Sequence, residues 1–199
     1  LAGDPGIGKS TLLLQLAIQG SIRTLYVSGE ESESQIKLRA DRIGVKNKEC
    51  FILNETLIEN ILSYLSIKEN HHQLIIIDSI QTLYSNQIAS PIGSISQIRE
   101  CCSQLLQLAK GTNITIFIIG HITKDGQIAG PKILEHMVDA VLHFEGDKNF
   151  QFRILRSKKN RFGSTSEIGL YEMGKTGLYS VKSPSKILLS DNFKNLDGC

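Results

Sequence analysis

Strand-sized apolar runs alternate with segments of helical periodicity from the start of the chain as far as Gly120. The apolar runs span residues 23–28, 50–53, 74–77 and 114–119. The segments whose apolar residues recur every three or four positions span residues 9–19, 32–44, 56–68 and 95–111. This alternation is typical of an α/β fold in which helices flank a mainly parallel central sheet.

The pattern changes after residue 140, where strand-like stretches at 140–145, 150–157 and 167–171 are separated by turns alone. Because antiparallel strands can be joined by short turns, we expect these stretches to extend the sheet as antiparallel strands. Residues 183–199 contain few residues that could pack. The sequence therefore predicts one domain over residues 1–182, followed by a linker or the start of a truncated C-terminal domain.

Two of the expected helices begin at a capping-box pattern, in which a hydroxyl residue is followed three positions later by Gln or Glu. Ser32 with Gln35 has this pattern, and so does Thr56 with Glu59. The helix that starts near residue 95 is expected to stop at Gly111, because glycine commonly follows a helix end.

The composition is that of a soluble globular protein, with 41 % hydrophobic and 21 % charged residues and a net charge of +2. No apolar run is long enough to cross a membrane. The cysteines have no C-x-x-C spacing, so we expect a reducing, cytoplasmic location and no zinc site; they are Cys50, Cys101, Cys102 and Cys199. Basic residues gather in one stretch, at Lys148, Arg153, Arg156, Lys158, Lys159 and Arg161.

Residues 3–10 read GDPGIGKS, a complete phosphate-binding loop directly before a helical segment. Its glycines let backbone N–H groups surround a phosphate, Lys9 can neutralise the outer phosphates of ATP, and Ser10 can bind Mg²⁺. The expected nucleotide-binding residues are Gly3, Asp4, Pro5, Gly6, Ile7, Gly8, Lys9, Ser10 and Thr11. Only two residues precede the loop, so we expect a fragment whose first strand is truncated.

Three polar side chains follow the predicted parallel strands at their carboxyl ends, which meet at one edge of the sheet. Asp78 follows an apolar strand and occupies the Walker B position, where a carboxylate can bind Mg²⁺ directly or through water. Glu30 is the preferred residue for activating the attacking water, whereas Glu31 can simply favour the start of the next helix. His121 can sense the γ-phosphate through a hydrogen bond.

Six motifs together resemble the RecA-like branch of P-loop ATPases and, within it, the bacterial RadA (Sms) family of DNA-repair proteins. They are GDPGIGKSTLLLQ at 3–15, YVSGEES at 26–32, DSIQT at 78–82, GHITKDG at 120–126, IAGPKILEHMVD at 128–139 and KNRFG at 159–163. The KNRFG motif is the most specific for that family, because the phosphate loop occurs in many unrelated NTPases. The resemblance extends across most of the chain.

The resemblance implies a RecA-like P-loop NTPase fold and a DNA-stimulated ATP hydrolase that requires Mg²⁺. It further implies a homo-oligomeric ring, with six subunits expected, that acts with recombinase RecA on single-stranded or branched DNA. Members of the family also carry a cysteine-rich zinc module and a domain similar to that of the Lon protease. This chain shows neither pattern, so we expect no zinc in it.

By the same resemblance, Lys159 and Arg161 would reach across a subunit boundary to the γ-phosphate of a neighbour, as finger residues. A cation in that position stabilises the charge of the transition state. The competing interpretation is that these two residues bind DNA phosphates directly, which a salt-dependent affinity would report.

Two loops are candidates for DNA contact. The first spans residues 121–137 and is expected to be mobile, with Lys124 and Lys132 as its DNA-binding residues. The second spans residues 85–96. Neither has interleaved aromatic residues that could stack on bases, so contact would be mostly with the backbone of the DNA.

Two alternative functions stay open at this point. A KaiC-type or replicative-helicase-type RecA-fold ATPase would share the acid at the strand end but should lack the KNRFG motif. A nucleotide-gated assembly module would bind ATP with little hydrolysis. Measurement of turnover with and without single-stranded DNA separates these possibilities.

Overall fold

The computed structural model describes residues 1–121, 129–146 and 152–181. The helices of the described part are α1 (Lys9–Gln19), α2 (Glu33–Ile43), α3 (Ile58–Ser66), α4 (Ile95–Thr112) and α5 (Ala129–Met137), with 3-10 turns η1 (Lys68–Asn70) and η2 (Ile80–Thr82). The strands are β1 (Ala2–Gly3), β2 (Thr24–Ser28), β3 (Cys50–Asn54), β4 (Leu74–Asp78), β5 (Thr115–Ile118), β6 (Gly120–His121), β7 (Ala140–Gly146), β8 (Phe152–Asn160), β9 (Ile168–Gly174) and β10 (Gly177–Ser180).

The strands form a four-stranded and a six-stranded sheet that follow each other along one segment of the chain. One part has the order β3-β2-β4-β5 and the other β6-β1-β7-β8-β9-β10. Only Ile119 separates β5 from β6, and its N–H donates to the carbonyl of Ile77 at 2.9 Å, so the two parts continue into each other. All pairs from β3 to β7 are parallel, and those from β7 to β10 are antiparallel. The predicted fold class is confirmed.

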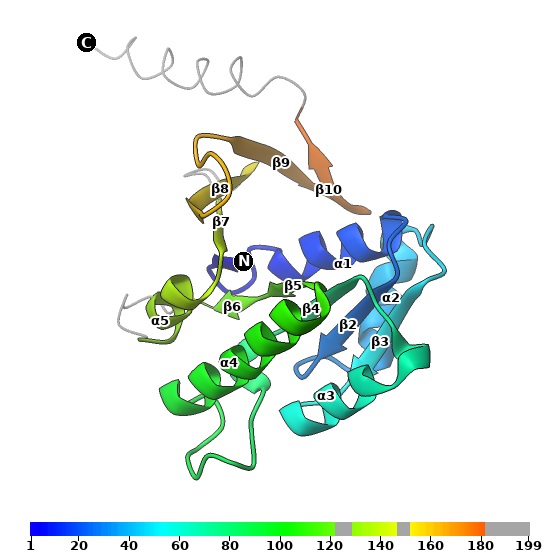
Figure 1. The fold of residues 1–199 in the computed structure, drawn as a ribbon. Helices are drawn as coiled ribbons and strands as arrows, with labels where there is room; N and C mark the ends of the chain where they lie inside the picture. The colour runs from blue at the N-terminus through cyan, green and yellow to red at the C-terminus, as the bar shows by residue number, and fades with distance from the viewer. Residues whose placement is uncertain (122–128, 147–151, 182–199) are drawn as a thin grey trace, which may run out of the picture.

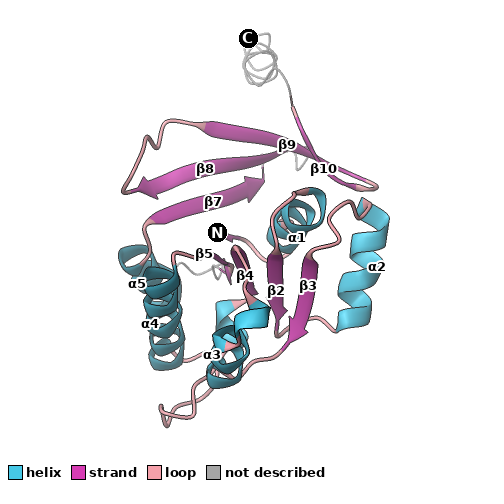
Figure 2. Ribbon diagram, turned by 45° about the vertical axis from the view of Figure 1, so that its right-hand side comes forward, coloured by secondary structure: helices cyan, strands magenta, loops and turns pink. Residues whose placement is uncertain are grey.

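Helices cover both faces of the parallel strands, because successive strand residues point to opposite sides. Ile75 and Ile77 of β4 face α3 and α4, and Ile76 between them faces α1 and α2. All three side chains are fully buried. Figures 1 and 2 show these two layers, with the antiparallel strands β7–β10 extending beyond them on one side. The parallel strands therefore read as continuous apolar runs, as buried parallel sheets do.

Of the two predicted capping boxes, one is confirmed and the other is wrong. Ser32 caps α2, with its side chain accepting from the N–H of Gln35 and the Gln35 side chain accepting in return. At α3 the carboxylate of Glu55 instead accepts from the N–H groups of Thr56 and Leu57, at 2.7 and 2.9 Å. Helix α3 begins at Ile58, with Leu57 rather than Thr56 at its N-cap position and no side chain of the described residues capping it, so the predicted box does not form.

Two elements were missed and one helix end was misplaced. The segment expected to be a mobile loop at 121–137 contains helix α5, which begins at Ala129. Its proline lies in the first helical turn, where no intrahelical N–H is needed. Strand β10 was also not predicted. Helix α4 runs through Gly111 and ends at Asn113, whose φ of 57° is the left-handed conformation that terminates a helix.

His72 is a fully buried histidine at the beginning of β4, away from the carboxyl ends of the strands. Its ring stacks on Tyr64 at a centroid distance of 6.1 Å and meets Phe51 edge-on at 5.5 Å. Among the described residues, neither ring nitrogen has a hydrogen-bond partner. The side chain therefore acts as an aromatic core residue rather than as a ligand or catalyst.

The burial of His72 makes the stability of the fold depend on pH. Burial lowers the pKa of His72 below its ordinary value of 6.5, and the charges of Arg23 and His71 add to this effect while Glu49 opposes it. As the pH falls, His72 is therefore protonated in the unfolded chain before it is protonated in the folded chain. Protonation thus favours the unfolded chain, and the free energy of unfolding decreases as the pH falls below about 6.5. We expect the free energy of unfolding to fall by up to about 1.4 kcal/mol per pH unit from this group.

Urea denaturation between about pH 7.5 and pH 5.5 measures this slope. His72→Leu should flatten it, whereas His136→Gln, at an exposed histidine of α5, serves as the matched control. An unchanged slope in His72→Leu would show that other groups cause the pH dependence.

No helix in the described ranges is long and apolar enough to pass through a membrane.

Candidate nucleotide-binding and hydrolysis site

The phosphate-binding loop joins β1 to α1 at the centre of the sheet. Gly8 is the residue before the helix and has a φ of 110°, a conformation that glycine adopts without strain. No side chain of the described residues caps the first N–H groups of α1. Free N–H groups at a helix N-terminus attract anions, so this end of α1 offers the donors that a phosphate needs.

Lys9 points its ammonium group into the loop. Its Nζ donates to the carbonyls of Gly3 and Asp4, at 2.8 and 2.9 Å, and only 3 % of the residue is exposed. Burial lowers the pKa of Lys9, while the nearby carboxylates of Asp78, Asp4 and Glu30 oppose that shift. The ammonium therefore lies beside the backbone cradle, where phosphate oxygens could replace the carbonyls as acceptors.

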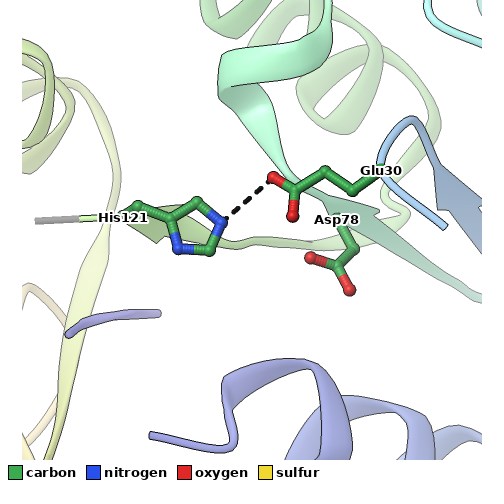
Figure 3. A group of neighbouring side chains, drawn as sticks. All are labelled: Glu30, Asp78 and His121. Carbon is green, nitrogen blue, oxygen red and sulfur yellow. Dashed lines mark hydrogen bonds and ion pairs between the residues drawn. The ribbon is translucent and has the colours of Figure 1, made fainter. Parts of the chain in front are cut away.

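Glu30, Asp78 and His121 converge from the carboxyl ends of β2, β4 and β6 (Figure 3). One ligand atom from each lies within 4.8 Å of the others. The strands that carry them and the strand of the phosphate loop follow one another in the sheet. The structure thus brings together the three side chains that the sequence placed at strand ends.

Asp78 is almost fully buried, with 4 % of the residue exposed. Its Oδ2 accepts from the hydroxyl of Tyr26 at 2.5 Å, and burial together with the charge of Asp78 raises the pKa of that tyrosine. The other oxygen, Oδ1, is buried and has no hydrogen-bond partner among the described residues. A buried carboxylate oxygen without a donor is suited to a cation or to a water bound to one.

The donor set therefore fits Mg²⁺. The hydroxyl of Ser10 and the Oδ1 of Asp78 offer oxygen atoms, which this hard cation prefers as ligands. His121 offers a nitrogen instead, which suits transition metals better than magnesium. We therefore assign His121 to hydrogen bonding rather than to the magnesium ion.

Glu30 is held from both sides through one carboxylate oxygen. Its Oε1 accepts from the hydroxyl of Ser79 at 2.5 Å and lies 3.1 Å from Nε2 of His121. The backbone before it is also fixed, because the N–H of Gly29 donates to the carbonyl of Asp78 at 3.1 Å. A Cβ on Gly29 would lie 2.3 Å from the hydroxyl oxygen of Thr82, so only glycine fits there.

Glu31 and Arg153 each bind a partner other than the three converging side chains. The carboxylate of Glu31 pairs with Arg39 of α2. From β8, Arg153 donates through Nε to the carbonyl of Ile7 in the phosphate loop, at 3.2 Å. Sequence reasoning missed this contact, since a basic stretch does not reveal which of its members reaches the loop.

Lys159 and Arg161 lie at the C-terminal end of α5. The Nζ of Lys159 donates to the carbonyls of Glu135 and Val138, both at 2.7 Å, and the guanidinium of Arg161 pairs with Asp139 at 2.9 Å. In the described part of the chain, their side-chain hydrogen bonds and ion pairs go to residues 135–139 and not to the phosphate loop of the same subunit. The adjacent Phe162 is 86 % exposed.

The structure gives only part of the two candidate DNA loops. Lys124 lies outside the described residues, and the same holds for the side chain of Lys132. In the loop at 85–96, the buried side chain of Gln97 donates to the carbonyls of Ile88 and Ser90, at 2.8 and 3.1 Å. That loop contains no Lys or Arg, so it offers no side-chain charge for DNA phosphates.

A cavity of the described residues lies elsewhere. It has a volume of about 590 Å³ and is bounded by β5, β7, α4 and α5. Its walls include apolar residues such as Leu105, Phe117 and Val141, and no residue of the phosphate loop borders it. A triphosphate needs donors and cations, so this cavity is not the nucleotide site.

Comparison with known protein families agrees with the site. Residues 1–127 match a family described as an AAA domain. The chain belongs to this AAA domain family. The matched residues include the phosphate loop and the strand ends that carry Glu30, Asp78 and His121.

Similar curated proteins are bacterial RadA proteins. The chain is 54 % identical over 194 residues to the DNA repair protein RadA of Bacillus subtilis, covering 96 % of this chain and 42 % of the relative. It is 52 % identical over 201 residues to RadA of Rickettsia conorii, covering 100 % of this chain and 45 % of the relative. The resemblance to the RadA family is confirmed, and the chain spans less than half of the length of these relatives.

Solved structures show the same fold at low sequence identity. A KaiC-like protein from Pyrococcus horikoshii superposes with a TM-score of 0.70 at 19 % identity, over 90 % of this chain and 87 % of that one. The RadB recombinase superposes with a TM-score of 0.63 at 19 % identity, over 91 % of this chain and 90 % of that one. The RecA-like architecture is therefore confirmed.

Proposed function

We propose that this chain is the ATP-hydrolysing core, over residues 1–182, of a DNA-dependent ATPase that acts in recombinational DNA repair. The observation that carries the proposal is the convergence of Glu30, Asp78 and His121 beside the loop that contains Lys9. Similarity to the DNA repair protein RadA and to the RadB recombinase supports the cellular role. Hydrolysis would drive processing or branch migration of recombination intermediates on single-stranded DNA.

In the proposed reaction, a water molecule attacks the γ-phosphorus of ATP. The bond from that phosphorus to the β,γ-bridging oxygen breaks, and its electron pair leaves with ADP. Glu30 takes the proton of the attacking water and later releases it to solvent, so the carboxylate is regenerated. Lys9 neutralises charge on the outer phosphates, and His121 reports the γ-phosphate by exchanging its contact with Glu30 for a phosphate oxygen.

Mg²⁺ would be held by Ser10 and, directly or through water, by Asp78. When bound, the ion neutralises phosphate charge beside the reacting bond. Tyr26 keeps Asp78 in place by donating to its second oxygen, which leaves Oδ1 for the metal side of the site. The phosphate loop orients the triphosphate through its backbone N–H groups.

The site would be completed by a second subunit. Lys159 and Arg161 are the proposed finger residues, in a homo-oligomeric ring for which six subunits are expected. Both cations are bound to the end of α5 within one subunit, so acting in trans requires them to exchange those partners for the phosphate of a neighbour. Hydrolysis would then depend on assembly.

DNA is the proposed effector, and recombinase RecA the proposed protein partner. Lys124 and Lys132 remain the proposed DNA-binding residues, because the loop at 85–96 has no cation to offer. Contact through lysines would be sequence-independent and would weaken with salt. A protein that works on chromosomal recombination intermediates in a bacterium would act in the cytoplasm.

Turnover of the full-length protein tests the proposal. We expect single-stranded DNA to raise ATP hydrolysis, and Lys9→Ala to abolish hydrolysis with and without DNA. The measurement is steady-state phosphate release across a DNA titration at fixed salt. Nucleotide-dependent assembly without phosphate release would favour the alternative of a nucleotide-gated assembly module. A rate of ATP hydrolysis that does not change with DNA would contradict the DNA-dependent role.

A further inference from the structure

Ser79 is a buried hydroxyl that makes its hydrogen bond to the proposed catalytic acid. The residue is 0 % exposed, and its Oγ donates to Oε1 of Glu30 at 2.5 Å. Because water is excluded from Ser79, no solvent molecule competes for this donor. A buried hydrogen bond to a carboxylate is stronger than an exposed one between neutral groups.

The backbone around Ser79 is fixed from two directions. Its carbonyl accepts from the hydroxyl of Thr82 at 2.8 Å, which ties it to the turn η2. The preceding carbonyl, of Asp78, accepts from the N–H of Gly29. The end of β4 and the end of β2 are thus joined once through the backbone and once through the side chains of Ser79 and Glu30.

The two donors to Glu30 share one oxygen. Both the hydroxyl of Ser79 and Nε2 of His121 lie within hydrogen-bond distance of Oε1, and among the described residues both of these contacts are to that oxygen rather than to Oε2. Rotation of the carboxylate would break both contacts. The arrangement therefore selects which oxygen of Glu30 stays available for water.

We propose that Ser79 is a positioning residue that holds Oε1 of Glu30, so that Oε2 is the oxygen that accepts the proton of the attacking water. The proposal rests on the proposed function, because it requires Glu30 to be the base. Ser79 is buried at the end of β4, so its hydrogen bond to Glu30 remains when His121 turns from Glu30 to a phosphate oxygen. It fixes the carboxylate during the step in which His121 has left it.

The test is Ser79→Ala in the full-length protein. Loss of one hydrogen bond to a charged group should lower kcat about tenfold to a hundredfold, with KM for ATP within about twofold of the wild type because nucleotide contacts are retained. Ser79→Cys keeps a weaker donor of similar size and should give an intermediate kcat. Thermal unfolding of each variant verifies that the protein is folded.

Thr24→Val is the matched control. Thr24 is also a buried hydroxyl residue, on β2, and its Oγ1 donates to the carbonyl of Ile22 at 2.9 Å at the far end of that strand. It loses a buried hydroxyl without touching the site, so kcat should remain at the wild-type value. If Thr24→Val lost as much kcat as Ser79→Ala, general loss of packing would explain the result and the proposal would fall.

A double variant distinguishes this proposal from the role of Glu30 itself. If Ser79 acts through Glu30, single-turnover hydrolysis by Glu30→Gln should fall no further when Ser79→Ala is added. Additive losses would overturn the positioning role, as would a raised KM with unchanged kcat or equal losses in Ser79→Ala and Ser79→Cys. Full turnover by Glu30→Gln would instead overturn the proposed function, independently of any result at Ser79.

Discussion

Glu30→Gln is expected to lower kcat for ATP hydrolysis by about 10²–10⁴-fold, the range that a positioned general base contributes. The substitution keeps the size and shape of the side chain. Its amide oxygen can still accept from Ser79, so the residue should stay in place. What it loses is the ability to take a proton from water, and KM for ATP should therefore change little.

Glu31→Gln is the matched control, because it makes the same change at the adjacent position. Glu31 pairs with Arg39, and its side chain is 30 % exposed. Loss of a partly exposed ion pair costs at most about 1 kcal/mol of stability and should leave turnover near the wild-type value. Steady-state turnover and equilibrium binding of ATP, measured on both variants, separate the two acids. Strong loss in Glu31→Gln with full activity in Glu30→Gln would reverse the assignment.

The strand ends could be read from the sequence because parallel strands bring their carboxyl ends to one edge of a sheet. That geometry brings Glu30, Asp78 and His121 together whatever the details of the connecting loops. The antiparallel pairing of β7, β8 and β9 was predictable for a similar reason, since short turns join antiparallel neighbours. These features depend on the order of elements rather than on particular contacts.

The missed features depend on particular local contacts. Glu55 binds the N–H groups of Thr56 and Leu57, and helix α3 begins only after them, so Thr56 does not cap the helix; sequence spacing cannot fix a helix start to a single residue. Helix α5 was hidden because Pro131 and its neighbouring glycine resemble a loop, although proline is tolerated in a first turn. The contact of Ser79 with Glu30 could not be predicted, because the sequence shows only a hydroxyl residue directly after the acid at the strand end.

The second large effect is expected at Arg161. If Arg161 is a finger residue, Arg161→Ala should lower kcat by about 10³–10⁵-fold, as removal of arginine fingers does in related phosphoryl-transfer enzymes. Folding should survive, since the pair with Asp139 is about half exposed and such pairs contribute little. Arg156→Ala is the matched control, because Arg156 lies on β8 five residues before Arg161, carries the same charge and pairs with Glu145 at 3.6 Å. Its turnover should stay near that of the wild type.

Mixed rings distinguish action in trans from action within one subunit. Arg161→Ala subunits have an intact phosphate loop, and Lys9→Ala subunits have an intact finger, so some interfaces in a mixture contain both. In a ring with head-to-tail contacts and random mixing of equal amounts, roughly a quarter of the interfaces would be complete. Phosphate release should then recover to roughly that share of the wild-type rate, although each variant alone is inactive.

The competing role of Arg161 gives the opposite pattern. A residue that binds DNA phosphates in its own subunit would weaken DNA binding and lower the slope of log K against log salt by about one. Turnover at saturating DNA would then be intact in Arg161→Ala, and mixing would restore nothing because nothing was lost at the interface. Lys159 should respond less than Arg161 in the mixing experiment, since its ammonium already donates to several carbonyls at the end of α5 and leaving them costs more.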